Sequence, residues 1–176
     1  VAEKTDMPAG VFNVVTSSDH MVGEELTLSP KVDQISFTGS TRVGKRIMEL
    51  GSASLKRVFL ELGGKSAAMV MDDVDIEQLL PMLAFGACVH GGQGCAMQTR
   101  ALIPRQHYKR AIEILEAAFQ NFPYGDPQGM DVMMGPVVSK IQRERILGYI
   151  EKGKAEGARL IAGGGRPEKF PKGWYV

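Results

Sequence analysis

Two residues of this chain could act as a nucleophile and a general base. Cys95 lies on a turn with glycines at positions 91, 92 and 94, which exposes a thiol and leaves backbone N–H groups free to stabilise an oxyanion. Glu61 ends an apolar run 34 positions before Cys95, where burial of an unpaired carboxylate would be costly. A free thiol has a pKa of about 8.5, so Cys95 needs a base, a helix dipole or a cation beside it to react at neutral pH.

Plainer interpretations stay open for these residues. Glu61 could be a solvated charge at the end of a strand. A free cysteine is usually a small buried hydrophobe, and this is our interpretation of Cys88, which falls on the apolar face of a predicted helix. His90 is a weaker candidate for the base that activates Cys95.

A strand-to-helix turn follows Phe37 and is a candidate phosphate site. Glycine allows close approach of the backbone to a ligand, and a helix N-terminus offers free N–H groups and partial positive charge. The turn is similar to a P-loop, but Arg46 stands where that motif needs Ser or Thr to hold magnesium. A capped turn without a ligand is the alternative. The candidate residues are Thr38, Gly39, Ser40, Thr41, Arg42, Val43 and Gly44.

Composition excludes several classes of protein. The 176 residues are 44% hydrophobic and 23% charged, with a formal net charge of +1, which argues against electrostatic binding of nucleic acid. No apolar run approaches the ~18 residues of a membrane helix, and no signal-peptide pattern is visible. Cys88 and Cys95 form neither a CxxC pair nor a disulfide framework, so we expect free thiols in a reducing, cytoplasmic compartment. Because Val1 is no initiator methionine and residues 173–176 read as half a strand, we expect an internal piece of a longer protein.

Hydrophobic periodicity and turn residues predict alternating strands and helices. This order predicts a parallel sheet in an α/β fold, and the change of pattern after Gly64 predicts two domains, 1–62 and 63–176. Asp72, Asp73 and Asp75 are expected to cap a helix, because the spacing and glycine of an EF-hand are absent; we predict no metal site. Predicted strands are 11–15, 34–37, 57–62, 67–71, 101–103, 158–162 and 173–176; predicted helices are 17–28, 41–51, 76–88, 106–119 and 139–156.

Three motifs in this order and spacing resemble the aldehyde dehydrogenase superfamily. They are residues 37–44 (FTGSTRVG), 60–65 (LELGGK) and 92–95 (GQGC), and residues 8–15 (PAGVFNVV) and 135–137 (GPV) also fit. The interval between Glu61 and Cys95 is similar to the family's as well. The resemblance covers the whole chain but only the middle of a family member, and it implies a three-layer αβα fold with mostly parallel sheets. Residues 1–62 would be part of the NAD(P)-binding domain and residues 63–176 part of the catalytic domain.

The resemblance also implies a role for each candidate. Cys95 would attack a small-molecule aldehyde, with its own N–H holding part of the oxyanion, and hydride transfer to NAD or NADP would leave a thioester. Glu61 would activate the water that hydrolyses it, which favours release of a free acid over an acyl-CoA. In the cofactor site, Ser40 would lie at the pyrophosphate, Val43 at the adenine, and Thr38, Gly39 and the backbone of Leu62 toward the nicotinamide.

The resemblance implies limits too. The family's second oxyanion donor and ribose-binding residues would lie outside Val1–Val176, so we expect the isolated chain to have little or no activity. The longer protein is expected to be a homo-oligomer, a dimer or tetramer, without nucleic-acid or membrane partners. A non-catalytic nucleotide-binding module and a cofactor-independent cysteine hydrolase remain the alternatives.

Overall fold

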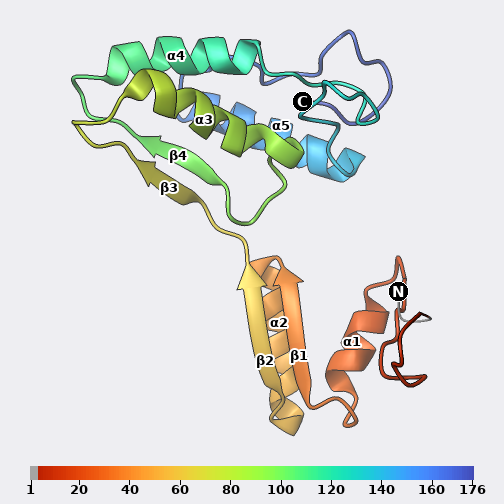
Figure 1. The fold of residues 1–176 in the computed structure, drawn as a ribbon. Helices are drawn as coiled ribbons and strands as arrows, with labels where there is room; N and C mark the ends of the chain where they lie inside the picture. Colours follow the sequence, from red (N-terminus) through yellow and green to blue (C-terminus); the bar gives the residue numbers. More distant parts are fainter. Residues whose placement is uncertain (1–3) are drawn as a thin grey trace. The chain divides into compact units, whose positions relative to one another are not determined.

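The chain folds into two compact units that divide between Gly63 and Gly64. The structure, a computed structural model, describes residues 4–176. It confirms the α/β class, because each unit contains a pair of parallel strands together with helices (Figure 1). Within the described residues, no helix is both long and apolar enough to cross a membrane.

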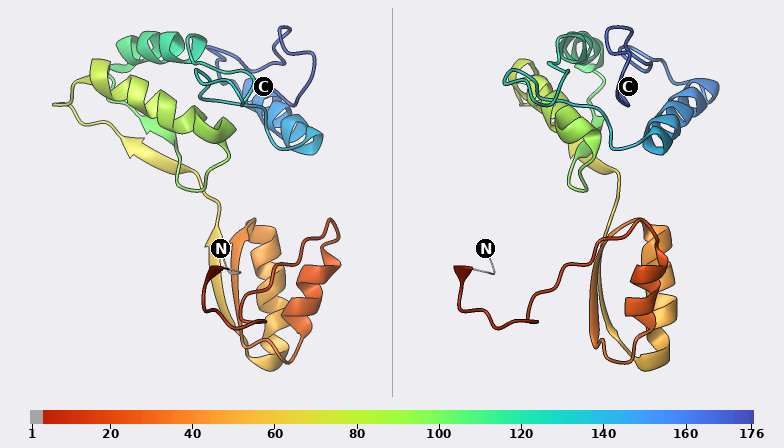
Figure 2. Two further views of the ribbon diagram at one scale, coloured as in Figure 1. Left: turned by 45° about the vertical axis from the view of Figure 1, so that its right-hand side comes forward. Right: turned by 90° about the vertical axis from the view of Figure 1, so that its right-hand side faces the viewer.

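The first unit is a parallel strand pair with two helices on one face (Figure 2). Its elements are α1 (Met21–Leu28), β1 (Gln34–Gly39), α2 (Thr41–Gly51), the short 3₁₀ helix η2 (Ser52–Ser54) and β2 (Arg57–Leu62). Both strands alternate exposed and half-buried residues, as expected when one face of a sheet is covered. On α2 the buried residues recur on one helical face, at Gly44, Ile47 and Gly51.

The second unit holds the larger core. Leu80 is fully buried, and it clusters with Val70, Ile76, Ala111 and Ile114. Helix α3 packs against both β4 and α4 (Figure 1). The elements are β3 (Ser66–Met69), α3 (Ile76–Cys88), the 3₁₀ segment η3 (Val89–Gly92), β4 (Gln98–Leu102), α4 (Tyr108–Gln120) and α5 (Lys140–Ala155).

Three predicted strands are wrong. Residues 11–15, 158–162 and 173–176 are not strands in the structure. A strand needs a neighbour for its backbone hydrogen bonds, and the strand pairs β1–β2 and β3–β4 include none of these segments. Instead, the Val11 N–H donates to the Pro8 carbonyl in a turn, at 3.3 Å. The Val137 N–H donates to the Trp174 carbonyl at 3.1 Å.

The predicted caps at Ser40 and Asp75 are confirmed, since both side chains accept hydrogen bonds from the first turns of α2 and α3. The structure adds a cap at Ser139, whose hydroxyl accepts the Gln142 N–H in the first turn of α5. Helix α1 begins only at Met21, because the Asp19 carboxylate accepts the Met21 N–H from outside the helix. Among residues 4–176, no three or more His, Cys, Asp or Glu side chains are grouped so that they could hold a metal ion.

Candidate active site

The ends of β1 and β2 bring Glu61 beside the predicted phosphate turn. In the parallel register Thr38 pairs with Glu61 and Gly39 pairs with Leu62. Both strands therefore end at the same edge, which is the edge where sites collect in α/β sheets. The predicted base and the predicted cofactor turn thus lie next to each other within the first unit.

Free backbone donors lie at the start of α2. Ser40 has an extended backbone, and its hydroxyl accepts the Val43 N–H at 3.4 Å. Among the described residues, the N–H groups of Thr41 and Arg42 have no acceptor, as is usual in the first turn of a helix. Together with the helix dipole, they form a place where a phosphate group fits.

Gly44 lies on the inner face of this turn. It is buried, and a Cβ at this position would lie 3.0 Å and 3.1 Å from the two terminal carbons of Leu62. Because that contact is tighter than ordinary van der Waals packing, glycine lets α2 approach β2 closely. The structure thus gives Gly44 a packing role against Leu62, while contact of either residue with a cofactor stays a prediction.

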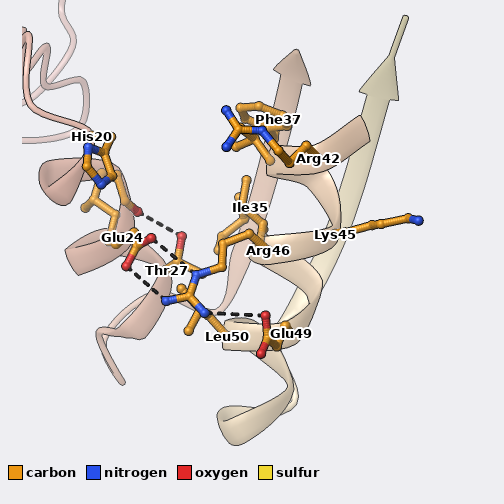
Figure 3. Close-up of a pocket in the computed structure, with 14 residues that line it drawn as sticks. His20, Glu24, Thr27, Ile35, Phe37, Arg42, Lys45, Arg46, Glu49 and Leu50 are labelled. Carbon is orange, nitrogen blue, oxygen red and sulfur yellow. Dashed lines mark hydrogen bonds and ion pairs between the residues drawn. The ribbon is translucent and has the colours of Figure 1, made fainter. Parts of the chain in front are cut away.

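A cavity of about 970 Å³ lies between α1 and α2 above β1 (Figure 3). This volume lies at the upper end of the range usual for small-molecule and cofactor sites. Most of its exposed wall is apolar, and charged side chains such as Glu24, Arg42 and Lys45 also line it. The apolar lining comes from Leu26, Ile35, Phe37, Val43, Ile47 and Leu50.

Arg46 crosses between the two helices at this cavity. Its Nε and Nη2 donate to the two Glu24 carboxylate oxygens at 3.3 and 3.4 Å, and its Nη1 donates to Glu49 at 3.4 Å (Figure 3). The hydrogen bond with Glu24 is the main cause that raises the pKa of Arg46. The sequence reasoning missed Glu24 and Arg46, because they are 22 positions apart and no local pattern pairs them.

Glu61 is exposed, and its carboxylate has no hydrogen-bond or ion-pair partner anywhere in residues 4–176. No structural ion pair within residues 4–176 occupies this carboxylate, so Glu61 stays a candidate general base.

Cys95 belongs to the second unit, in the loop that joins η3 to β4. Three successive residues before it have left-handed backbones: His90, Gly91 and Gly92 have φ angles of 55°, 66° and 69°. Cys95 is exposed, and its own N–H has no acceptor in the part of the chain that the structure describes. The loop therefore presents both a thiol and a free backbone donor.

Cys88 differs from Cys95 in its surroundings. It is half-buried at the end of α3, and burial raises the pKa of its thiol. Since the thiolate is the reactive form, this burial disfavours reaction at Cys88. The two thiols are free, as predicted.

Comparisons with known proteins identify the family. The model of the aldehyde dehydrogenase family matches residues 1–176. The putative aldehyde dehydrogenase DhaS of Bacillus subtilis is 38% identical over 99% of this chain, and the peroxisomal aminoaldehyde dehydrogenase 2 of Malus domestica is 40% identical over all of it. The chain spans about a third of their length, 35% in both cases.

Solved structures give the same result for the fold. An aldehyde dehydrogenase C (AldC) mutant from Pseudomonas syringae, solved with NAD⁺ and octanal, matches with a TM-score of 0.93 and 33% identity, over 97% of this chain and 35% of that one. A Mycobacterium tuberculosis aldehyde dehydrogenase, solved with NAD⁺, matches with a TM-score of 0.85 and 42% identity, over 88% and 32%. With the family model covering its whole length, the chain belongs to the aldehyde dehydrogenase family.

Proposed function

We propose that this chain is the central part of an NAD(P)-dependent aldehyde dehydrogenase that oxidises a small-molecule aldehyde to a carboxylic acid. The observation that carries the proposal is the register of β1 and β2, which sets Glu61 and Leu62 beside the turn that begins at Thr38. Membership of the family, and relatives solved with NAD⁺ and with octanal, support the reaction class.

The first unit supplies the cofactor site in this proposal. The free N–H groups of Thr41 and Arg42 and the Ser40 hydroxyl bind the pyrophosphate, and Val43 faces the adenine in the apolar cavity. Thr38, Gly39 and the Leu62 backbone lie toward the nicotinamide. NAD(P)⁺, when bound, supplies the hydride acceptor.

The second unit supplies the nucleophile. The Cys95 thiolate attacks the aldehyde carbon, and the Cys95 N–H donates to the oxygen that becomes negative. Loss of hydride converts this adduct to a thioester on Cys95. Glu61 then takes a proton from water, and the resulting hydroxide attacks the thioester carbon, which breaks the C–S bond, releases the carboxylic acid and restores the Cys95 thiolate.

We also propose that residues 1–176 alone have little activity. A single oxyanion donor in place of two costs about 10²-fold or more in rate. We propose that the second donor and the ribose-binding groups belong to other parts of a longer protein, which is homo-oligomeric and cytoplasmic.

Replacement of the two cysteines tests the proposal. In a longer, active form, Cys95→Ala should lower aldehyde-dependent NAD(P)H formation by at least about 10³-fold, whereas Cys88→Ala should leave most of it. Equal activity of Cys95→Ala and wild type would refute the proposal. A cysteine hydrolase would be favoured if Cys95 were needed for ester hydrolysis, if NAD(P)⁺ did not increase that hydrolysis and if no aldehyde were oxidised. Magnesium-dependent binding of ATP would favour a P-loop module.

A further inference from the structure

The loop that carries Cys95 rests on a segment about 45 positions further along the chain. A Cβ added to Gly91 would lie 3.7 Å from the Gly135 carbonyl oxygen and 3.8 Å from a methyl of Val137. These are ordinary van der Waals distances. The left-handed turn before Cys95 therefore lies close to residues 135–137, with room for about one methyl group between Gly91 and that segment.

The Gln93 side chain joins the two backbones at this contact. Its Oε1 accepts the Val138 N–H at 3.0 Å, and its Nε2 donates to the His90 carbonyl at 2.9 Å. Both ends of the carboxamide are thus used, each on a backbone group. One end holds the segment, and the other holds the first left-handed residue of the loop.

The segment is anchored by a second contact as well. The neighbouring Val137 N–H donates to the Trp174 carbonyl at 3.1 Å, and Val137 is buried. Tyr175, also buried, donates from its hydroxyl to the Gly125 carbonyl at 2.9 Å. The Val138 N–H is consequently presented to Gln93 from a part of the unit that is itself fixed by packing.

We propose that Gln93 is the positioning residue for Cys95. Its carboxamide holds the loop of residues 90–95 in one conformation, so that the thiol and the Cys95 N–H keep a fixed geometry. An exposed loop with few buried contacts would otherwise open readily, and a misplacement of about 1 Å can cost 10²-fold in rate. The role of Cys95 as nucleophile rests on the proposed function, whereas the holding of the loop by Gln93 does not.

Three variants of the 176-residue chain separate the two ends of the carboxamide. Gln93→Met keeps the length of the side chain but removes both hydrogen bonds. Gln93→Glu keeps the acceptor for the Val138 N–H and loses the donor to the His90 carbonyl. Gln120→Met is the matched control, because Gln120 is exposed and its side chain bonds only to Glu116 within α4.

Amide hydrogen exchange measures the effect of losing each of the two hydrogen bonds of the Gln93 carboxamide. In Gln93→Met, the Val138 amide should exchange about fivefold faster, the effect of losing one net hydrogen bond. In Gln93→Glu, Val138 should stay near wild type while the amides of residues 91–95 exchange faster. Gln120→Met should change neither. Wild-type exchange at Val138 in Gln93→Met, or unchanged exchange of residues 91–95 in Gln93→Glu, would overturn the proposal. If Gln93→Met does not fold, Gln93→Glu alone still tests the loop.

A label on the Cys95 thiol reports the conformation of the loop rather than the stability of the fold. In a Cys88→Ala background, a trifluoromethyl label on Cys95 should give one narrow ¹⁹F resonance with Gln93 and several or broadened resonances with Gln93→Met. One unchanged resonance in Gln93→Met would contradict the proposal.

In an active longer form, Gln93→Met should lower kcat about tenfold or more with an unchanged KM for NAD(P)⁺. If Cys95→Ala kept its activity but exchange responded as described, the proposed function would fail and the holding of the loop would stand.

Discussion

The turn at residues 38–44 in the first unit and the loop at residues 90–95 in the second unit are held in shape in different ways. The first is a regular strand-to-helix junction, closed by the Ser40 cap and the close approach of Gly44 to Leu62. The second has three successive left-handed residues and is tied by Gln93 to Val138. The first geometry follows from neighbours in sequence, whereas the second depends on residues far along the chain.

The largest difference between the units is in their cores. Leu80 is fully buried in the second unit, so Leu80→Ala should lower the free energy of unfolding by about 3 kcal/mol, through lost burial and a cavity. Hydrogen exchange should show the loss in residues 64–176 and leave α2 unchanged. Met130→Ala is the control, since Met130 is 96% exposed. Equal destabilisation of α2 would mean that the units do not unfold separately.

The next effect tests the left-handed loop. Gly91→Ala should destabilise the second unit by about 1–2 kcal/mol, the cost of a Cβ at positive φ. His90→Gly should stabilise it by up to about 1 kcal/mol for the same reason, because His90 has a φ of 55°. Urea midpoints measure both, and effects of the same sign would contradict the assigned backbone strain.

Helix caps offer a matched pair across the two units. Ser40→Ala should cost about 0.5–1 kcal/mol in the first unit, and Ser139→Ala a similar amount in the second. The Ser40 bond is the longer one, at 3.4 Å against 3.2 Å, so its effect should be the smaller. Exchange rates of the first-turn amides of α2 and α5 check this, and a response of α5 to Ser40→Ala would be a contradiction.

The smallest effect is a pH dependence confined to the second unit. Hydrogen bonds from Arg110 lower the pKa of Glu77 below its ordinary value of 4.5. The pair therefore stabilises the folded state above pH 4.5, and the contribution is lost as the pH falls through the lowered pKa. Both side chains are more than half exposed, so the effect should be small and weakened by salt. Thermal melts of Glu77→Gln should show a shallower acid dependence than wild type, and an identical one would disprove the assignment.

Sequence patterns predicted what local rules determine. The strands β1 and β2, the Ser40 cap and the helix from Asp75 follow from residues within a few positions of each other, and the structure confirmed them. The parallel pairing that sets Glu61 beside Thr38 followed from the order of strands and helices. Residues 11–15 have the composition of a strand but no neighbour in either described strand pair, and composition alone does not supply one.

The remaining features needed contacts that no local pattern contains. Arg46 bridges to Glu24 on another helix, and Gln93 reaches Val138 across 45 positions. In the sequence both residues were only parts of glycine-containing motifs. The thiol and the carboxylate were recognisable from residue type, whereas the groups that hold the thiol in place were not.

We propose that Cys95 forms the covalent intermediate and that Glu61 activates the water that hydrolyses it. Mass spectrometry of Glu61→Gln in an active longer form, mixed with aldehyde and NAD(P)⁺, tests it most directly. The account predicts a burst of about one NAD(P)H per active site and an acyl group on the peptide that contains Cys95, which persists because water is no longer activated. Turnover at the wild-type rate without an acyl adduct, or an adduct on Cys88 in place of Cys95, would contradict it.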